Sequence, residues 1–472
     1  MHFLAPLLAV AALARATALP SAAEAGPTIH TFTSDITDGA LRYVNNSGIC
    51  ETTPGVHTMS GYVDTSPTMH TWFWFFAARN ASATAPFTLW LNGGPGCSSM
   101  IGLFQENGPC NVNSDGKTTV NNPYSWNTVS NMLYIDQPIG TGFSYGTDSV
   151  TSTLTAAPAI WTVLQTLFDS PEFAAYQSRE FILATESYGG HYGPEFAEYF
   201  EIQNNAIAAG ALKGVPLKLS ALMINNGWID PLIQNGQYIT FAQDAPGYGA
   251  LVSAATVERM NATYFGAGGC LAQQQACYAA GNASASDSVC EDADNFCATL
   301  FEDAAGDRDP YDLRQSSAAA FPPEYYVTYL GRAAVRSAIG ATASTYAECP
   351  DAPYDKFVPS GDDARTFLPQ LGNIVDKGVR VLVWAGDADI ICNWLGGQAA
   401  VRAMEWAGKA QLAATPLTNI TLAGAPVAAV ANVNNFTFAR VFGAGHEVAA
   451  FVPAAALAIF EQIVAGEPLH SV

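Results

Sequence analysis

Short apolar runs alternate with longer mixed stretches in the first half of the chain. The short runs are bounded by polar, Gly or Pro positions, and the first of them is strongly aromatic, which is typical of buried strands. The longer stretches predict helices, and strand–helix alternation predicts an α/β sheet with crossover connections. The expected strands are residues 70–77, 86–91, 132–136 and 181–185, and the expected helices are 161–168 and 193–207.

The same pattern returns near the end of the chain. Residues 379–385 form a wholly apolar run that ends in Gly-Asp, 436–442 form a second such run, and 453–465 predict an apolar helix. Between the halves, over residues 228–355, the chain turns to Ala- and Gly-rich runs, acidic patches and clustered cysteines. We therefore expect one sheet that is built from both halves and interrupted by an inserted cap region.

A serine stands where a predicted strand gives way to glycines and a helix. The segment FILATESYGG carries Ser187 out of the strand and into the turn, which is the setting of a nucleophile elbow. Gly189 supplies the small residue that this turn needs, whereas Thr185 replaces the usual preceding glycine and makes the turn tighter. The alternative is a serine that only caps the helix.

A serine hydroxyl becomes a nucleophile when a base takes its proton and an acid holds that base. Of seven histidines, His446 is best placed, on a glycine-rich loop after a predicted strand, and His191 is expected to be structural. Asp387 and Asp389 both follow the strand at 379–385, and spacing does not choose between them. The order Ser, Asp, His is that of α/β-hydrolases and predicts a serine hydrolase.

Catalysis also needs backbone N–H groups that stabilise the oxyanion. The amide of Tyr188, directly after the serine, is one candidate donor. The glycine-rich segment WLNGGPGCSS at 90–99 is expected to supply the other. The alternatives for that segment are an ordinary tight turn or a phosphate loop, but no Lys follows it as a phosphate loop requires.

Composition and charge indicate a globular protein and exclude two classes of partner. About half of the 472 residues are apolar (49%), which predicts a globular protein. Acidic residues outnumber basic ones 41 to 19, and the net charge is −22. Such a chain repels phosphate backbones and anionic lipids, so we expect neither nucleic acid nor a membrane surface as a partner.

The N-terminus predicts export. Residues 3–13 are mostly apolar and are followed by Ala16-Thr17-Ala18, a small-x-small cleavage site, so 1–18 is expected to be a signal peptide. A buried N-terminal helix is the alternative. Asn-x-Ser/Thr sequons support an exported, glycosylated surface. The sequons are Asn45, Asn80, Asn261, Asn282, Asn419 and Asn435.

Nine cysteines in an exported chain predict disulfides and one free thiol. Four of them are spaced by seven, thirteen and seven positions, which predicts the nested pairs Cys270–Cys297 and Cys277–Cys290. A zinc site is the weaker alternative, because no Cys-x-x-Cys or His partner lies nearby.

Several segments together resemble the serine carboxypeptidases. WLNGGPGCSS at 90–99, ESYGG at 186–190, NGWIDP at 226–231, GDADIICNW at 386–394 and GAGHEV at 443–448 match family motifs in family order, and 42–64 is similar to secreted fungal members. The resemblance implies an α/β-hydrolase fold with a central, mostly parallel mixed sheet, an inserted cap, and no metal or organic cofactor. One departure is Ala449-Ala450, where the family usually has proline after Val448.

The resemblance also implies residue roles. Ser187 is the nucleophile, Asp389 the acid and His446 the base, and Gly94 and Tyr188 form the oxyanion hole. The C-terminal carboxylate of the substrate is held by Asn92, Glu106 and Glu186, with Trp90 and Gly93 beside them. Cys392 is a free thiol near the substrate pocket, Cys97 pairs with Cys349, and Cys50 is left to pair with Cys110.

Two glutamates and an asparagine are an unusual site for a carboxylate, which proteins most often bind with Arg or Lys. Buried carboxyls that lie close together have raised pKa values, and a protonated carboxyl donates a hydrogen bond to a carboxylate. We therefore expect peptide binding to weaken as Glu106 and Glu186 lose their protons. The alternative is that both glutamates only orient the oxyanion loop.

The expected protein is a serine-type carboxypeptidase that releases C-terminal amino acids from peptides and proteins at acidic pH. It is secreted or delivered to a vacuolar or lysosome-like compartment. An acyltransferase with the same triad and a catalytically inactive homologue are the alternatives. The expected organisation is a signal peptide at 1–18, a hydrolase core at 19–227 and 356–472, and the cap at 228–355.

Overall fold

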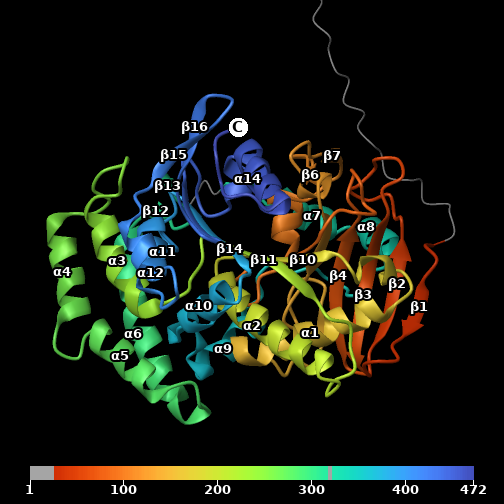
Figure 1. Cartoon of the computed structure of the whole chain (residues 1–472), viewed down its shortest axis with the longest axis horizontal. Coiled ribbons are helices and arrows are strands. Elements are labelled where there is room, and N and C mark those ends of the chain that lie inside the picture. Colours follow the sequence, from red (N-terminus) through yellow and green to blue (C-terminus); the bar gives the residue numbers. More distant parts are fainter. Residues whose placement is uncertain (1–25, 317–320) are drawn as a thin grey trace, which may run out of the picture.

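The computed structural model describes residues 26–316 and 321–472 (Figure 1). The expected signal peptide therefore lies outside the described residues. One large mixed sheet runs through the molecule, and its centre consists of six parallel strands in the order β8-β5-β10-β11-β14-β17. These strands span Asn131–Ile135, Phe87–Leu91, Glu180–Glu186, Lys218–Asn225, Arg380–Gly386 and Phe436–Val441.

Antiparallel strands extend the sheet at both edges (Figure 1). On one side β4 pairs with β8, and β3, β2 and β1 follow, while β9 pairs with the end of β4. On the other side β16 and β15 follow β17. These strands are β1 (His30–Thr33), β2 (Ala40–Asn45), β3 (Thr58–Ser66), β4 (Met69–Phe76), β9 (Tyr145–Gly146), β15 (Thr418–Leu422) and β16 (Ala425–Val433).

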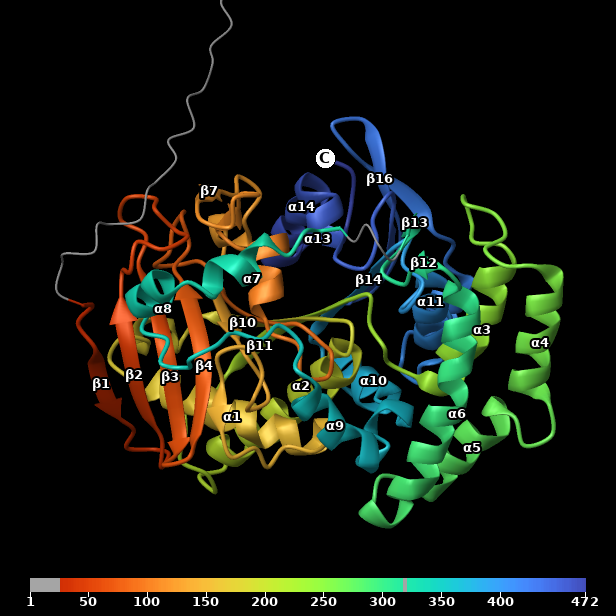
Figure 2. The same ribbon diagram turned by 180° about the vertical axis from the view of Figure 1, so that it is seen from behind.

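The central strands are buried on both faces, as their continuous apolar runs predict. Alternate residues of β5 contribute to two separate apolar cores: Leu89 and Leu91 to one, and Trp90 to the other. Helices α1 (Thr153–Asp169), α2 (Gly189–Ala208) and α10 (Leu368–Asp376) cover the first face, and α13 (Val448–Phe451) and α14 (Pro453–Ala465) cover the second (Figures 1 and 2).

The segment between β11 and β14 is mostly helical. Helices α3 to α6 pack together at one end of the molecule in both views, and α7 and α8 lie toward the opposite edge of the sheet (Figures 1 and 2). The bounds are α3 (Pro231–Gln243), α4 (Ala254–Phe265), α5 (Cys270–Ala280), α6 (Asp287–Ala305), β12 (Arg308–Asp309), β13 (Asp312–Ser316), α7 (Tyr325–Leu330), α8 (Ala333–Ile339) and α9 (Asp351–Phe357). After β14 come α11 (Trp394–Ala403) and α12 (Lys409–Ala414).

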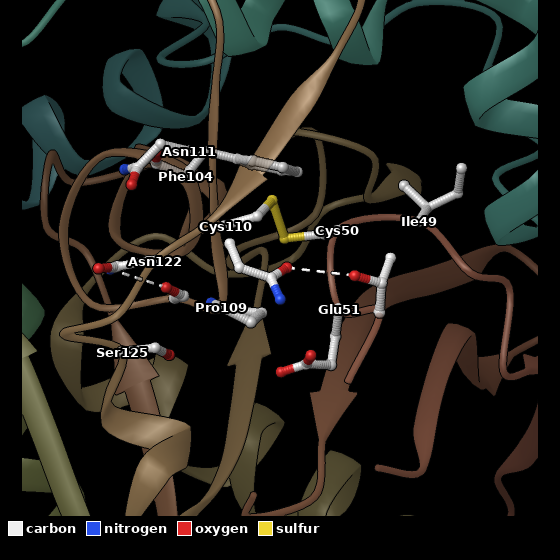
Figure 3. The surroundings of a disulfide bond; sticks show 12 residues. Ile49, Cys50, Glu51, Phe104, Pro109, Cys110, Asn111, Asn122 and Ser125 are labelled. Carbon is white, nitrogen blue, oxygen red and sulfur yellow. Dashed lines mark hydrogen bonds between the residues drawn. A yellow bond between two sulfur atoms is a disulfide. The ribbon is translucent and has the colours of Figure 1, made fainter. Parts of the chain in front are cut away.

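Among the described residues four disulfides are present, in the four pairings that were expected. Cys270–Cys297 and Cys277–Cys290 join α5 to α6, and Cys97–Cys349 joins the glycine-rich loop to the segment before α9. Cys50–Cys110 joins the loop after β2 to β6 (Cys110–Val112), which pairs with β7 (Thr119–Asn121), and Phe104 and Pro109 lie beside it (Figure 3). Cys392 is a free, buried cysteine.

Candidate active site

The turn between β10 and α2 holds Ser187 in the left-handed region, with a φ of 62°. The backbone of a non-glycine residue is strained in this region. A nucleophile elbow, the sharp turn that exposes a catalytic serine, has this geometry. The Ser187 N–H donates to Asn225 O at 3.0 Å, and its carbonyl accepts from the Trp228 N–H at 2.9 Å. A Cβ added to Gly189 would lie 2.5 Å from the Thr185 Cβ, so the threonine makes the following glycine necessary.

The base and the acid meet at the ends of β17 and β14. His446 Nδ1 lies 2.9 Å from Asp389 Oδ2, and both side chains are buried. Burial acts to lower the pKa of His446, but the charge and hydrogen bond of Asp389, with Glu186 and Asp309 nearby, outweigh it and leave that pKa above its ordinary value. Bonded to Asp389 through Nδ1, the imidazole has its Nε2 free to serve a nucleophile.

The structure separates the two aspartates that spacing left open. Asp387 faces other groups: its carboxylate accepts from Tyr248 Oη at 2.8 Å, from the Gly443 N–H at 2.9 Å and from Arg440 Nη2 at 3.0 Å. Asp389 is the residue that bonds to His446. Asp387 therefore ties the loop after β14 to β17 and to the loop after α3.

One cavity of about 520 Å³ is lined by six of the eleven expected catalytic and substrate-binding residues, namely Asn92, Gly93, Gly94, Glu186, Ser187 and His446. Glu447, the residue after His446 in the sequence, also lines it. Six of the lining residues carry carboxyl groups, and none of the described lining residues is Lys or Arg. The carboxyl-bearing residues are Glu186, Asp309, Glu324, Glu348, Asp351 and Glu447.

The glycine-rich loop approaches the elbow at main-chain distance. A Cβ added to Gly93 would lie 2.4 Å from the Tyr188 backbone nitrogen, so no side chain fits between the two segments. Gly94, next along the loop, has a φ of 112° and is exposed to the cavity. The Cys97 N–H donates to Gly93 O at 3.0 Å, and the Cys97–Cys349 disulfide anchors the same loop. This arrangement suits the amides of Gly94 and Tyr188 as oxyanion donors.

Asn92 lies between two buried glutamates. Its Nδ2 donates to Glu186 Oε1 at 3.0 Å and to Glu106 Oε1 at 3.3 Å. Asn92 Oδ1 accepts from Trp90 Nε1 at 2.7 Å and from the Gly102 N–H at 3.0 Å. These two bonds fix the orientation of the side-chain amide, so that its NH2 group points toward the two carboxyl groups. Glu106 ends the short π-helical turn Gly102–Glu106, a wide turn that is frequent at functional sites.

Burial governs the acidity of these glutamates. It raises the pKa of Glu106 well above its ordinary value, and repulsion from Glu186 and Glu447 raises it further. Burial also raises the pKa of Glu186, although His446 and hydrogen bonds to Glu106, Asn225 and Asn92 act against the rise. Glu106 Oε2 is buried and has no hydrogen-bond partner among the described residues. The pair therefore holds protons at pH values where exposed glutamates have lost them.

Sequence reasoning missed three residues of this site. Asn225 Nδ2 donates to Glu186 Oε2 at 2.6 Å and to His446 O at 2.9 Å. Asn226, with a φ of 41°, donates from Nδ2 to Asp389 Oδ2 at 2.7 Å. Glu447, which follows His446 in the sequence, lines the cavity. The sequence did contain a signal for the two asparagines, because they stand at the end of β11, the strand next to β10. Parallel strands end at the same edge of a sheet, so both residues could be expected near Ser187.

Cys392 lies beside the acid and the base, whereas His191 is part of helix α2. Cys392 Sγ lies within 4.8 Å of the ligand atoms of Asp389 and His446. Burial raises the pKa of this thiol well above its ordinary value, so it stays protonated. His191 is buried in α2, and its Nδ1 lies 2.5 Å from Trp228 O, which fits the structural role expected for it.

Comparison with known proteins decides the family. The profile of the family described as serine carboxypeptidase matches residues 48–466. The chain belongs to the serine carboxypeptidase family. Carboxypeptidase S1 of Penicillium janthinellum is 48% identical over 91% of this chain and 100% of its own length. Carboxypeptidase Y homolog A of Coccidioides posadasii is 35% identical over 87% of this chain and 75% of its own length.

The fold agrees with this assignment. The crystal structure of Kex1Δp, a prohormone-processing carboxypeptidase from Saccharomyces cerevisiae, superposes with a TM-score of 0.69 at 22% identity, and covers 87% of this chain and 91% of its own. The protein is thus a serine carboxypeptidase with the expected α/β fold. In the described part of the chain, no helix combines the length and apolar character needed to cross a membrane.

Proposed function

We propose that this serine carboxypeptidase releases C-terminal amino acids from peptides and proteins at acidic pH through an acyl-enzyme on Ser187. The observation that carries the proposal is the placement of Asn92 between two buried carboxyl groups, one of which, on Glu186, borders the same cavity as Ser187. A hydrolase without chain-end specificity has no need of such a carboxyl pair beside its nucleophile.

The contact of His446 with Asp389 and the place of Ser187 in the same cavity as His446 support a two-step reaction. His446 takes the proton of Ser187 as the hydroxyl oxygen attacks the last peptide carbonyl, and Asp389 stabilises the imidazolium that forms. The amides of Gly94 and Tyr188 stabilise the oxyanion. His446 then gives its proton to the leaving amino group, the C-terminal amino acid departs, and water cleaves the acyl-enzyme by the same steps.

The carboxyl pair selects the chain end. When the substrate binds, Asn92 Nδ2 gives up its longer bond, the one to Glu106, and donates that N–H to the free carboxylate. A protonated glutamate donates a second hydrogen bond to it, and Trp90 and Gly93 support the site. As the pH rises both glutamates ionise and repel that carboxylate, so binding weakens. Glu106 Oε2, buried without a partner among the described residues, supports a role in binding over one confined to orienting the loop.

The other residues that line the cavity indicate which C-terminal side chain of the substrate is preferred. Glu324, Glu348 and Glu447 line it together with Asp309, and no Lys or Arg among the described lining residues opposes them. A cationic side chain is attracted by carboxylates, the more so as they ionise. We therefore expect C-terminal Lys and Arg to be accepted well, with an advantage over Leu that grows with pH.

Sequence and structure also support a place of action. The signal peptide expected at 1–18, the sequons and the four disulfides favour export, either to the outside or to an acidic vacuolar or lysosome-like compartment. We propose that residues 19–227 and 356–472 form the hydrolase core and 228–355 the inserted cap. The large sheet, which takes its strands from both outer segments, supports this division.

The test is release of amino acids from blocked dipeptides between pH 4 and 8. Each dipeptide is compared with its C-terminal amide, and Ser187→Ala is compared with the wild type. We expect release from the free acid at low pH, little from the amide, and none from Ser187→Ala with the fold intact. Equal hydrolysis of acid and amide, or activity in Ser187→Ala, would contradict the proposal. With an alcohol present, transfer of the acyl group to that alcohol as an ester, in place of hydrolysis to the free acid, would show an acyltransferase; the C-terminal amino acid leaves in both cases.

A further inference from the structure

The β12–β13 hairpin, from the helical segment between β11 and β14, reaches the catalytic loops. Both views place it near β14 (Figures 1 and 2). Asp309, Pro310 and Tyr311, at the tip of the hairpin, line the cavity that contains Ser187. A segment that contributes no triad residue is thus part of the wall around the triad.

The hairpin holds the loop that carries the acid. Pro310 O accepts from the backbone N–H groups of Ile390 and Ile391, each at 3.1 Å. The Leu313 N–H donates to Ala388 O at 2.8 Å. The residues on both sides of Asp389 are therefore bonded to the hairpin by their main chains.

The same hairpin holds the loop that carries the base. Tyr311 O accepts from the His446 N–H at 2.8 Å, and Arg314 Nη1 donates to Gly443 O at 2.9 Å. Asp312 fixes Arg314 with two hydrogen bonds, at 2.7 and 2.8 Å. A Cβ added to Gly445 would lie 2.5 Å from Tyr311 O, so this close contact needs glycine.

The Tyr311 ring packs on the catalytic imidazole. Its centroid lies 5.0 Å from that of His446, with an edge-to-face angle of 60°. The tyrosine is 48% exposed, so its ring stands between the imidazole and solvent and is not fixed in a deep core. No described residue hydrogen-bonds its hydroxyl, which leaves the ring as the part that acts.

We infer that Tyr311 is a positioning residue for His446. Its carbonyl fixes the backbone of the base, and its ring closes the space into which the imidazole would otherwise rotate away from Ser187. The inference rests on the proposed roles of Ser187 and His446. It gives the inserted segment a part in the chemical step, because the hairpin adds main-chain bonds beside the acid and at the base to the bonds that Asn226 and Asn225 already make with Asp389 and His446.

The test separates nucleophile activation from peptide binding. A small alkyl fluorophosphonate reacts with an activated serine and has no C-terminal residue, so its rate of inactivation reports how well His446 activates Ser187. Tyr311→Ala is compared with Tyr311→Phe, which keeps the ring, and with Tyr325→Ala, which removes an exposed tyrosine from α7. Tyr311→Leu, which keeps bulk without an aromatic face, replaces the alanine variant if that variant unfolds.

We expect Tyr311→Ala to react with the fluorophosphonate about 10-fold more slowly than the wild type, because a side chain freed to leave its rotamer populates the productive one less often. Its kcat for a blocked dipeptide should fall in parallel, while Tyr311→Phe and Tyr325→Ala stay within about twofold. An unchanged fluorophosphonate rate with a raised peptide KM would overturn the inference and make the ring a substrate contact only. A wild type that does not react with the probe would refute the proposed nucleophile instead.

Discussion

The variant Glu106→Gln directly tests how this enzyme binds the C-terminal carboxylate of its substrate. The glutamine side chain has the same shape, can accept from Asn92 Nδ2 and can donate as a protonated carboxyl does, but it never becomes negative. In the wild type, Glu106 Oε1 lies 3.3 Å from Asn92 Nδ2. A substrate carboxylate bound to the same nitrogen at a normal distance would therefore lie within about 6 Å of that oxygen.

The size of the effect follows from this separation. Two unit charges about 6 Å apart repel by about 3 kcal/mol at an effective dielectric constant of about 20, or roughly 100-fold in binding. Because burial raises the pKa of Glu106, the repulsion is absent in acid and develops as the pH rises toward neutrality. We expect the wild-type KM for a blocked dipeptide to rise by roughly that factor between pH 4 and 8.

Glu106→Gln should match the wild-type KM within a few-fold at pH 4 and rise much less by pH 8, the remainder coming from Glu186. Steady-state KM values at pH steps of one half provide the measurement, and an ester substrate without a free carboxylate serves as the control for general pH effects. A variant whose KM follows the wild-type pH curve would refute the reasoning, since Glu106 would then have no charge-dependent contact with the substrate.

Three further outcomes are expected. Asn226→Ala removes the 2.7 Å bond to Asp389 and should lower kcat by about 10-fold at constant KM in blocked-dipeptide assays; an unchanged kcat would show that the acid needs no such support. Burial raises the pKa of Asp136 and of Glu195 to about 7, so the folded state keeps protons that the unfolded chain has already lost. The midpoint of thermal unfolding should therefore fall as the pH rises from 4.5 to 7.5, less steeply in Glu195→Gln, and a midpoint that rises over this window would contradict those shifts. Burial raises the pKa of Glu447 well above its ordinary value, so Glu447→Gln should lower the ratio of kcat/KM for C-terminal Lys over Leu at pH 8 and leave it nearly unchanged at pH 4. An unchanged ratio at pH 8 would remove Glu447 from the recognition of the leaving side chain.

The parts of the fold that sequence predicts are those with a local signal. The apolar runs at 86–91 and 379–385 correspond to β5 and β14 within about a residue, and 453–465 matches α14 in full. Helix α1 begins at Thr153, well before the predicted start at 161, because its first turns consist of small residues without apolar periodicity. Its Ser152–Thr155 capping box was the usable signal.

Other features depend on contacts between distant segments. The edge strands β2, β3, β15 and β16 were not predicted, since short mixed or Ala-rich runs become strands only when a neighbouring strand pairs with them. The order of the triad along the chain is visible in the sequence, but the choice of Asp389 over Asp387 requires knowing which carboxylate faces His446. Asn225 and Asn226 act through partners 39 and 163 positions away, a separation that no local pattern reports.

The two disulfides around the glycine-rich loop have a consequence for where the enzyme can be made. Cys97–Cys349 and Cys50–Cys110 bracket the stretch 97–110, and Glu106 lies between their ends. Ser187, Asp389 and His446 stand instead on the ends of central strands that no disulfide joins. In a reducing host such as a bacterial cytosol these two disulfides would not form. The central strands that position Ser187 would be unaffected, but the stretch 97–110, which contains Glu106, would lose its covalent anchors. Because Cys97–Cys349 also anchors the loop that carries Gly94, such a preparation would lose oxyanion stabilisation together with end recognition, and its rates on simple esters and on peptides would both fall.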